Sequence, residues 1–142
     1  MKVHDLKLDV KYFEEVKLGK KKFEIRKNDR DFKIRDVLKL IAYRNGHYVR
    51  WSKNKGKWVH TIKEKADTIK VKVTYIINYF ETFKTVQPRY HIVDYCGKFR
   101  SGVDVPEYPK PPVEQMQEVL SGYFKVDCLP SSYVILGIEA YK

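Results

Sequence analysis

The sequence Gly19-Lys20-Lys21-Lys22-Phe23-Glu24-Ile25-Arg26, followed by Lys27-Asn28-Asp29-Arg30-Asp31, combines a helix end, a strand and a turn. Gly19 lies where a helix commonly closes on a residue with a left-handed backbone. Phe23 and Ile25 alternate with charged residues, which predicts a strand over Lys21–Arg26 with one apolar face. The Asn-Asp-Arg-Asp run that follows has a typical turn composition. These thirteen residues therefore predict a helix-to-strand junction that carries charges of both signs.

The rest of the chain predicts mainly strands. Val3–Val10 alternates between apolar and charged residues, and a short helix capped by Asp9 and closed by Gly19 follows it. The other expected strands are Val37–Tyr43, His47–Ser52, Lys57–Ile62, Thr68–Ile77 and Ser132–Tyr141. Tyr79–Tyr90 has no decisive pattern, Gly97–Pro112 reads as a surface loop, and Pro111–Gly122 as a short helix ended by Gly122. The pattern predicts one α+β domain over residues 1–142, with a mixed, barrel-like sheet.

Positive charge is in excess and unevenly distributed. The chain has 29 Lys and Arg against 18 Asp and Glu, a formal charge of +11 over 142 residues. Nine basic and two acidic residues lie between Arg44 and Lys72, whereas acids outnumber bases six to three from Asp104 onward. Such a basic body indicates a polyanionic partner, most commonly nucleic acid; the alternative is that the charge only keeps the protein in solution.

Aromatic and basic residues alternate around the predicted hairpin: Tyr48, Arg50, Trp51, Lys53, Lys55, Lys57 and Trp58. Bases stack on aromatic rings while Lys and Arg follow phosphates, so the segment is a plausible platform for a single strand. Trp51 shares its strand face with Val49, which favours a place in the core. Trp58 is then the better stacking candidate.

Other features narrow the function classes. Cys96 and Cys128 have no close spacing, and the chain begins in a strand without a hydrophobic targeting region, so we expect a cytoplasmic protein with free thiols. No apolar run approaches the length of a membrane span, so we expect no membrane partner. The four histidines lack the spacing of zinc ligands, and we expect neither a metal nor another cofactor.

The motif Gly19-x-Lys21-x-x-Glu24-x-Arg26 resembles the signature of the ASCH domain, a branch of the PUA-like superfamily. The resemblance is to a small bacterial and phage subgroup. It is specific over residues 3–43 and fair over residues 68–80 and the last strand. Relative to the shorter members, residues 97–122 resemble an insertion. It implies a pseudo-β-barrel of mostly antiparallel strands with one early and one short late helix, and a cleft that takes RNA or nucleosides. Many relatives carry Gly-Asp before the third strand where this chain has Arg35-Asp36, a change that alters backbone freedom and adds positive charge at the cleft rim.

The resemblance assigns roles to the charged residues of the motif. Lys21 and Glu24 would contact the ligand, and an amine beside a carboxylate can also act as a catalytic base. Arg26 offers a planar fork for phosphate. The ligand-binding set is completed by Arg30, Arg50 and Trp58.

Whether the protein is an enzyme stays open. Some ASCH proteins resemble amidohydrolases of acetylcytidine that use a Lys at the position of Lys21, but they have Thr where this chain has Glu24. They also use a second acid, for which Glu81 is a conceivable counterpart. Others resemble ribonucleases. The leading expectation is an RNA- or nucleotide-binding protein, and hydrolysis of a modified nucleoside or of RNA is the alternative.

Overall fold

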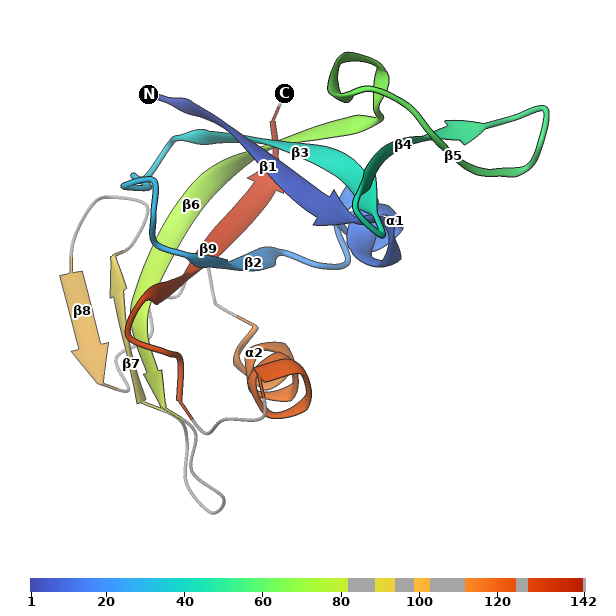
Figure 1. The fold of residues 1–142 in the computed structure, drawn as a ribbon. Helices are drawn as coiled ribbons and strands as arrows, with labels where there is room; N and C mark the ends of the chain where they lie inside the picture. Colours follow the sequence, from blue (N-terminus) through green and yellow to red (C-terminus); the bar gives the residue numbers. More distant parts are fainter. Residues whose placement is uncertain (82–88, 94–98, 103–111, 125–127, 142) are drawn as a thin grey trace. The chain divides into compact units, whose positions relative to one another are not determined.

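The computed structural model describes residues 1–81, 89–93, 99–102, 112–124 and 128–141 (Figure 1). The chain forms two compact units. The first unit comprises Met1–Lys22, Asp36–Lys72 and Glu139–Lys142, and the second unit Phe23–Arg35 and Val73–Ile138. Strands predominate, pair mostly antiparallel and are accompanied by two short α-helices, which confirms the α+β class.

The first unit is built on a central strand, β3. Its elements are β1 (Val3–Asp9), α1 (Val10–Lys17), β3 (Val37–Arg44), β4 (His47–Ser52), β5 (Lys57–His60), the 3-10 turn η1 (Lys63–Lys65) and the start of β6 (Thr68–Glu81). Strand β3 pairs in parallel with β1 (Figure 1) and antiparallel with β4 and β6, and β4 pairs with β5. The pairing of β4 with β5 confirms the predicted hairpin. In the preceding turn, between β3 and β4, Asn45 and Gly46 both have positive φ, as a tight turn between antiparallel strands requires.

The local signals at the beginning of the chain are confirmed. His4, Leu6 and Leu8 are buried on one face of β1. The Asp9 side chain accepts a hydrogen bond of 2.9 Å from the Lys11 backbone N–H and so caps α1. Gly19 has φ +74° and closes the helix in the left-handed region. The apolar core of the first unit comprises Leu6, Leu8, Phe13, Val16, Val37, Leu38, Leu40, Ile41, Ala42, Val49, Ala66 and Val71.

A buried polar contact fixes the start of β3 against β1. The His4 Nε2 and Asp36 Oδ2 atoms lie 2.8 Å apart, and Asp36 also accepts a hydrogen bond from the Lys2 backbone N–H. Asp36 is buried, at 2% exposure. The preceding Arg35 has φ +76°, a conformation in which a side chain is strained and glycine is not.

The second unit combines strands with the second helix. Its elements are β2 (Phe23–Lys27), the later part of β6, β7 (Arg89–Val93), β8 (Phe99–Gly102), α2 (Val113–Val119), the π-helical turn η2 (Leu120–Phe124) and most of β9 (Tyr133–Ala140). Strand β2 pairs antiparallel with β9, so that Phe23 lies opposite Gly137. Strand β7 pairs antiparallel with both β6 and β8.

One strand of this unit is longer than predicted, and two sequence predictions are wrong. Strand β6 continues to Glu81, because a register shift between Ile77 and Tyr79 breaks the alternation without ending the strand. Residues 99–102 form β8, whose pairing with the preceding strand β7 its Gly/Ser composition did not reveal. The rest of the predicted loop lies outside the described residues. Gly122 lies within η2 and does not end a helix, since the helical backbone runs on past α2.

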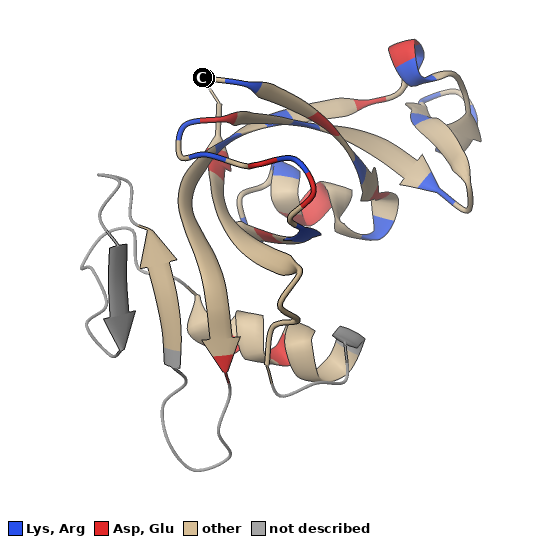
Figure 2. Cartoon of the chain, turned by 60° about the vertical axis from the view of Figure 1, so that its left-hand side comes forward, with Lys and Arg blue, Asp and Glu red and all other residues tan. Residues whose placement is uncertain are grey.

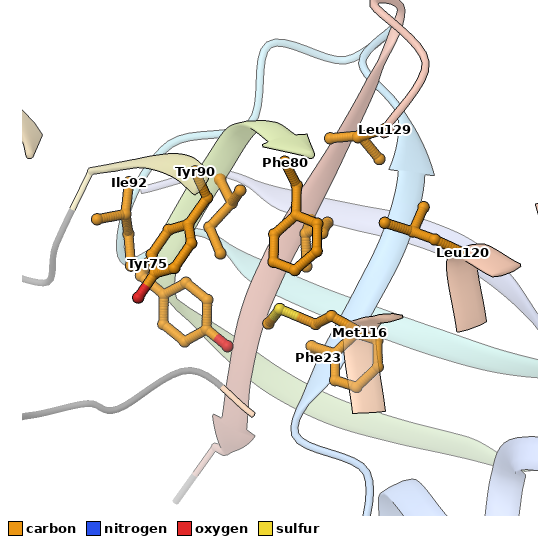
Figure 3. Packing of buried hydrophobic residues seen from close by; sticks show 10 residues of the cluster. Phe23, Tyr75, Phe80, Tyr90, Ile92, Met116, Leu120 and Leu129 are labelled. Carbon is orange, nitrogen blue, oxygen red and sulfur yellow. The ribbon is translucent and has the colours of Figure 1, made fainter. Parts of the chain in front are cut away.

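The core of the second unit is aromatic (Figure 3). It contains Phe23, Tyr75, Ile77, Phe80, Tyr90, Ile92, Met116, Leu120, Leu129 and Ile135. The hydroxyl groups of Tyr75 and Tyr90 are buried and have no hydrogen-bond partner among the described residues. Burial raises the pKa of both phenols, and the proximity of Tyr90 raises the pKa of Tyr75 further. The Tyr75 ring lies directly against Gly137, where a methyl group would overlap it.

Candidate nucleic-acid interface

The net positive charge is carried almost entirely by the first unit. By sequence, that unit has 18 Lys and Arg against 8 Asp and Glu, and the second unit has 11 against 10. Formal charges are therefore +10 and +1. In Figure 2 the blue of Lys and Arg recurs along the strands and helix of the first unit, whereas helix α2 of the second shows red and no blue. A polyanion would be attracted chiefly to the first unit.

Lys21 is held against the first helix. The backbone N–H groups of Lys20 and Lys21 both donate to the Glu15 carbonyl, at 2.8 and 3.1 Å, so the chain turns back at the end of α1. The Lys21 ammonium lies 4.5 Å from the ring centroid of Tyr12, a cation–π contact, and the side chain is half-buried. Lys11 approaches the same ring at 5.4 Å. The motif lysine is thus positioned by an aromatic ring that the sequence reading did not assign to it.

Glu24 and Arg26 form a pair on β2. They lie two residues apart on one strand face, and the Arg26 Nε donates to Glu24 Oε2 at 3.1 Å. The Glu24 side chain is buried, while that of Arg26 remains 25% exposed. The alternating pattern had placed Glu24 on a charged face, and its burial comes from the packing of β2 in the second unit. Glu24 and Arg26 thus pair within the second unit, whereas Lys21 contacts the Tyr12 ring within the first.

The remaining acidic and basic candidates of the second unit are more exposed. The Arg30 Nε lies 3.9 Å from Asp29 Oδ1, and both side chains are exposed, so the pair is weak. Glu81, the conceivable second acid, accepts a hydrogen bond from the Tyr79 hydroxyl. The His91 ring lies beside Tyr79, with centroids 4.8 Å apart.

The hairpin separates two of the predicted ligand contacts. Strand pairing places Trp51 opposite Trp58 and Arg50 opposite Val59, so Arg50 and Trp58 project from opposite faces. The expectation that Trp51 belongs to the core is wrong, because its surface is 46% exposed. Trp58 is half-buried, with its ring edge-on to both Trp51 and Phe13.

A third cation–aromatic contact had no role in the sequence prediction. Lys7 projects from β1 with its ammonium 4.7 Å from the Tyr43 ring centroid and 5.9 Å from that of Tyr48. The two rings meet edge to face across the turn between β3 and β4. The outward position of Lys7 was visible in the alternation of β1, but its partners follow from the parallel pairing of β1 with β3.

Comparison with known families gives one match. The family model described as a domain of unknown function (DUF3850) matches residues 3–95, which include Lys21, Glu24, Arg26, Arg30 and the hairpin. No curated protein matches the chain. None of the helices in the described ranges is both long and apolar enough to cross a bilayer.

Proposed function

The chain belongs to the DUF3850 family, and we propose that it binds RNA or a nucleotide through a basic cleft around Gly19-x-Lys21-x-x-Glu24-x-Arg26. The observation that carries the proposal is the charge of +10 on the first unit against +1 on the second. A charge needed only for solubility has no reason to be concentrated in this way. The PUA-like pseudo-barrel and a cytoplasmic location, both expected from the sequence, belong to the same proposal.

The contacts of Lys21 support a binding role. A ring face attracts the charged ammonium, and that is the form that pairs with phosphate. The turn after α1 holds this cation near one position, which reduces the side-chain entropy lost when a ligand binds. Glu24 and Arg26 contribute a buried carboxylate with a partly exposed guanidinium beside it. An arginine in such a pair can still present its outer N–H groups to an oxygen.

Binding of single-stranded RNA across a salt series tests the proposal. Lys21→Ala should weaken binding and reduce the slope of log K against log salt by about 0.7, the value for one lost phosphate contact on a single strand. Lys33→Ala is the matched control, because it removes the same charge from an exposed position, 68% accessible, in the second unit. Equal effects of both substitutions, or none from Lys21→Ala, would contradict a site at the motif.

The same experiment separates binding from turnover. Free nucleosides, including acetylcytidine, are titrated in parallel, and the products are examined by mass spectrometry. Saturable binding of a nucleotide that depends on Lys21 but hardly on salt would narrow the ligand to a mononucleotide. A product that forms with the wild type and not with Lys21→Ala would replace the binding proposal with a hydrolase.

A further inference from the structure

One face of the β4–β5 hairpin, which also carries the buried Val49, bears a row of aromatic rings. His47 and His60 stack with centroids 4.0 Å apart and planes 18° from parallel. Trp51 and Trp58 meet at 5.6 Å on the same face, because residues 47, 49 and 51 alternate with 48 and 50, and Trp58 lies opposite Trp51. His47, His60 and Trp51 are exposed. Four rings from two neighbouring strands thus share one side of the hairpin.

The row is supported by α1 and by the segment after η1. Phe13 of α1 packs edge-on to Trp58 at 5.4 Å. The Trp51 backbone N–H donates to Asp67 Oδ2 at 2.9 Å, and Asp67 N–H donates to the Val49 carbonyl at 3.3 Å, so the free side of β4 is bonded to the segment after η1. These bonds fix the backbone of Trp51, while its ring remains exposed.

Basic side chains gather at the hairpin tip, at one end of the row. Lys53, Lys55 and Lys57 are all exposed around the turn. Ser52 holds that turn through its hydroxyl, which accepts from Lys55 N–H, and through its carbonyl, which accepts from Gly56 N–H. No acidic residue occurs between Arg44 and Lys63. Exposed rings beside cations complement a ligand with flat bases and a phosphate backbone, and a duplex keeps its base faces stacked inside.

We propose that this hairpin face binds single-stranded RNA, with an unpaired base stacked on Trp51 and the adjoining phosphates at the tip lysines. The inference rests on the proposed function, since it names the class of nucleic acid that the basic unit takes. It also places a contact on a ring that lies outside the motif and on the face opposite Arg50. A sequence-tolerant site follows, because every base has a stacking face.

The test compares single-stranded and duplex RNA of one sequence by fluorescence anisotropy. Trp51→Ala should weaken binding of the single strand about 5- to 150-fold, the range for one lost base–aromatic stack, and change binding of the duplex by less than about twofold. Trp51→Phe should recover most of the affinity. Tyr141→Ala is the matched control, since Tyr141 is 44% exposed in the same unit but outside the hairpin, and it should bind like the wild type.

Tryptophan fluorescence detects the stacking of a base on Trp51 directly. Trp58→Phe keeps a ring against Phe13 and leaves Trp51 as the only tryptophan of the chain, which has two. Single-stranded RNA should quench the emission of this variant, as stacking requires. Single-strand affinity of Trp51→Ala within twofold of the wild type, or no quenching at saturation, would overturn the inference.

The two proposals fail in different ways. Loss of binding in Trp51→Ala with none in Lys21→Ala would retain the hairpin site and reject the motif site. The reverse result would reject the hairpin site alone. A wild-type protein that binds neither form of RNA would reject both.

Discussion

Replacing Tyr75 with phenylalanine should stabilise the protein, although it removes a polar group from a well-packed core. The Tyr75 hydroxyl is buried and has no hydrogen-bond partner among the described residues. A buried hydroxyl without a partner costs about 1–3 kcal/mol relative to water. Tyr75→Phe keeps the ring contacts and deletes this cost, so we expect a gain of about 1 kcal/mol, or roughly 3 °C in Tm for a chain of this size.

The gain should grow at alkaline pH. Because burial raises the pKa of Tyr75 in the folded state, the unfolded phenol ionises first, near its ordinary value of about 10. Above that pH the unfolded state binds fewer protons, so the free energy of unfolding of the wild type falls with pH, by about 1.4 kcal/mol per unit for this group. Phenylalanine does not ionise. The advantage of the variant should therefore be constant from about pH 7 to 9 and widen above about pH 10.

The measurement is urea unfolding followed by circular dichroism at several pH values from neutral to about 11, for the wild type and Tyr75→Phe. Tyr141→Phe serves as the control, because it changes an exposed phenol and should alter the stability at no pH. A loss of 1 kcal/mol or more at neutral pH in Tyr75→Phe would refute the reasoning. It would mean that the hydroxyl makes a hydrogen bond that stabilises the fold.

Two further substitutions test backbone and packing. Arg35→Gly should raise the free energy of unfolding by about 0.5–1 kcal/mol, because the strain of a side chain at φ +76° exceeds the extra entropy of an unfolded glycine; a loss of stability in urea would contradict this. Gly137→Ala should lower the free energy of unfolding by about 3 kcal/mol, since the added methyl group overlaps the buried Tyr75 ring. An unchanged midpoint in Gly137→Ala would mean that the ring moves freely.

The sequence was most informative where a few consecutive residues decide the structure. The Asp9 cap, the left-handed Gly19, the Asn45-Gly46 turn and the alternation of β1 depend on neighbours within a few positions, and each is confirmed. Strand β8 could not be recognised, because its four residues become a strand only by pairing with β7. The end of β6 was missed for a related reason, since the register shift after Ile77 hides the periodicity.

The candidate interface shows the same difference between local signals and tertiary packing. The motif pointed to Lys21, Glu24 and Arg26, but the Tyr12 ring under Lys21 and the burial of Glu24 result from tertiary packing. The exposure of Trp51 was missed because a shared strand face does not imply equal cover. Val49 on that face is buried, and Trp51 two residues later is not.

The pairing of β2 with β9 has a consequence for the newly made chain. Phe23 faces Gly137, so β2 must wait until the ribosome has added about 110 more residues, roughly 5–20 s at ordinary rates of synthesis. During that interval Phe23 and Ile25 belong to an unpaired strand, which is a template for aggregation. Lys20, Lys21 and Lys22 before it, and Arg26 and Lys27 at its end, are charges of the kind that keep such a strand apart from its copies. The charges of the motif are thus of a kind that protects this strand before β9 exists, whatever ligand the folded protein binds.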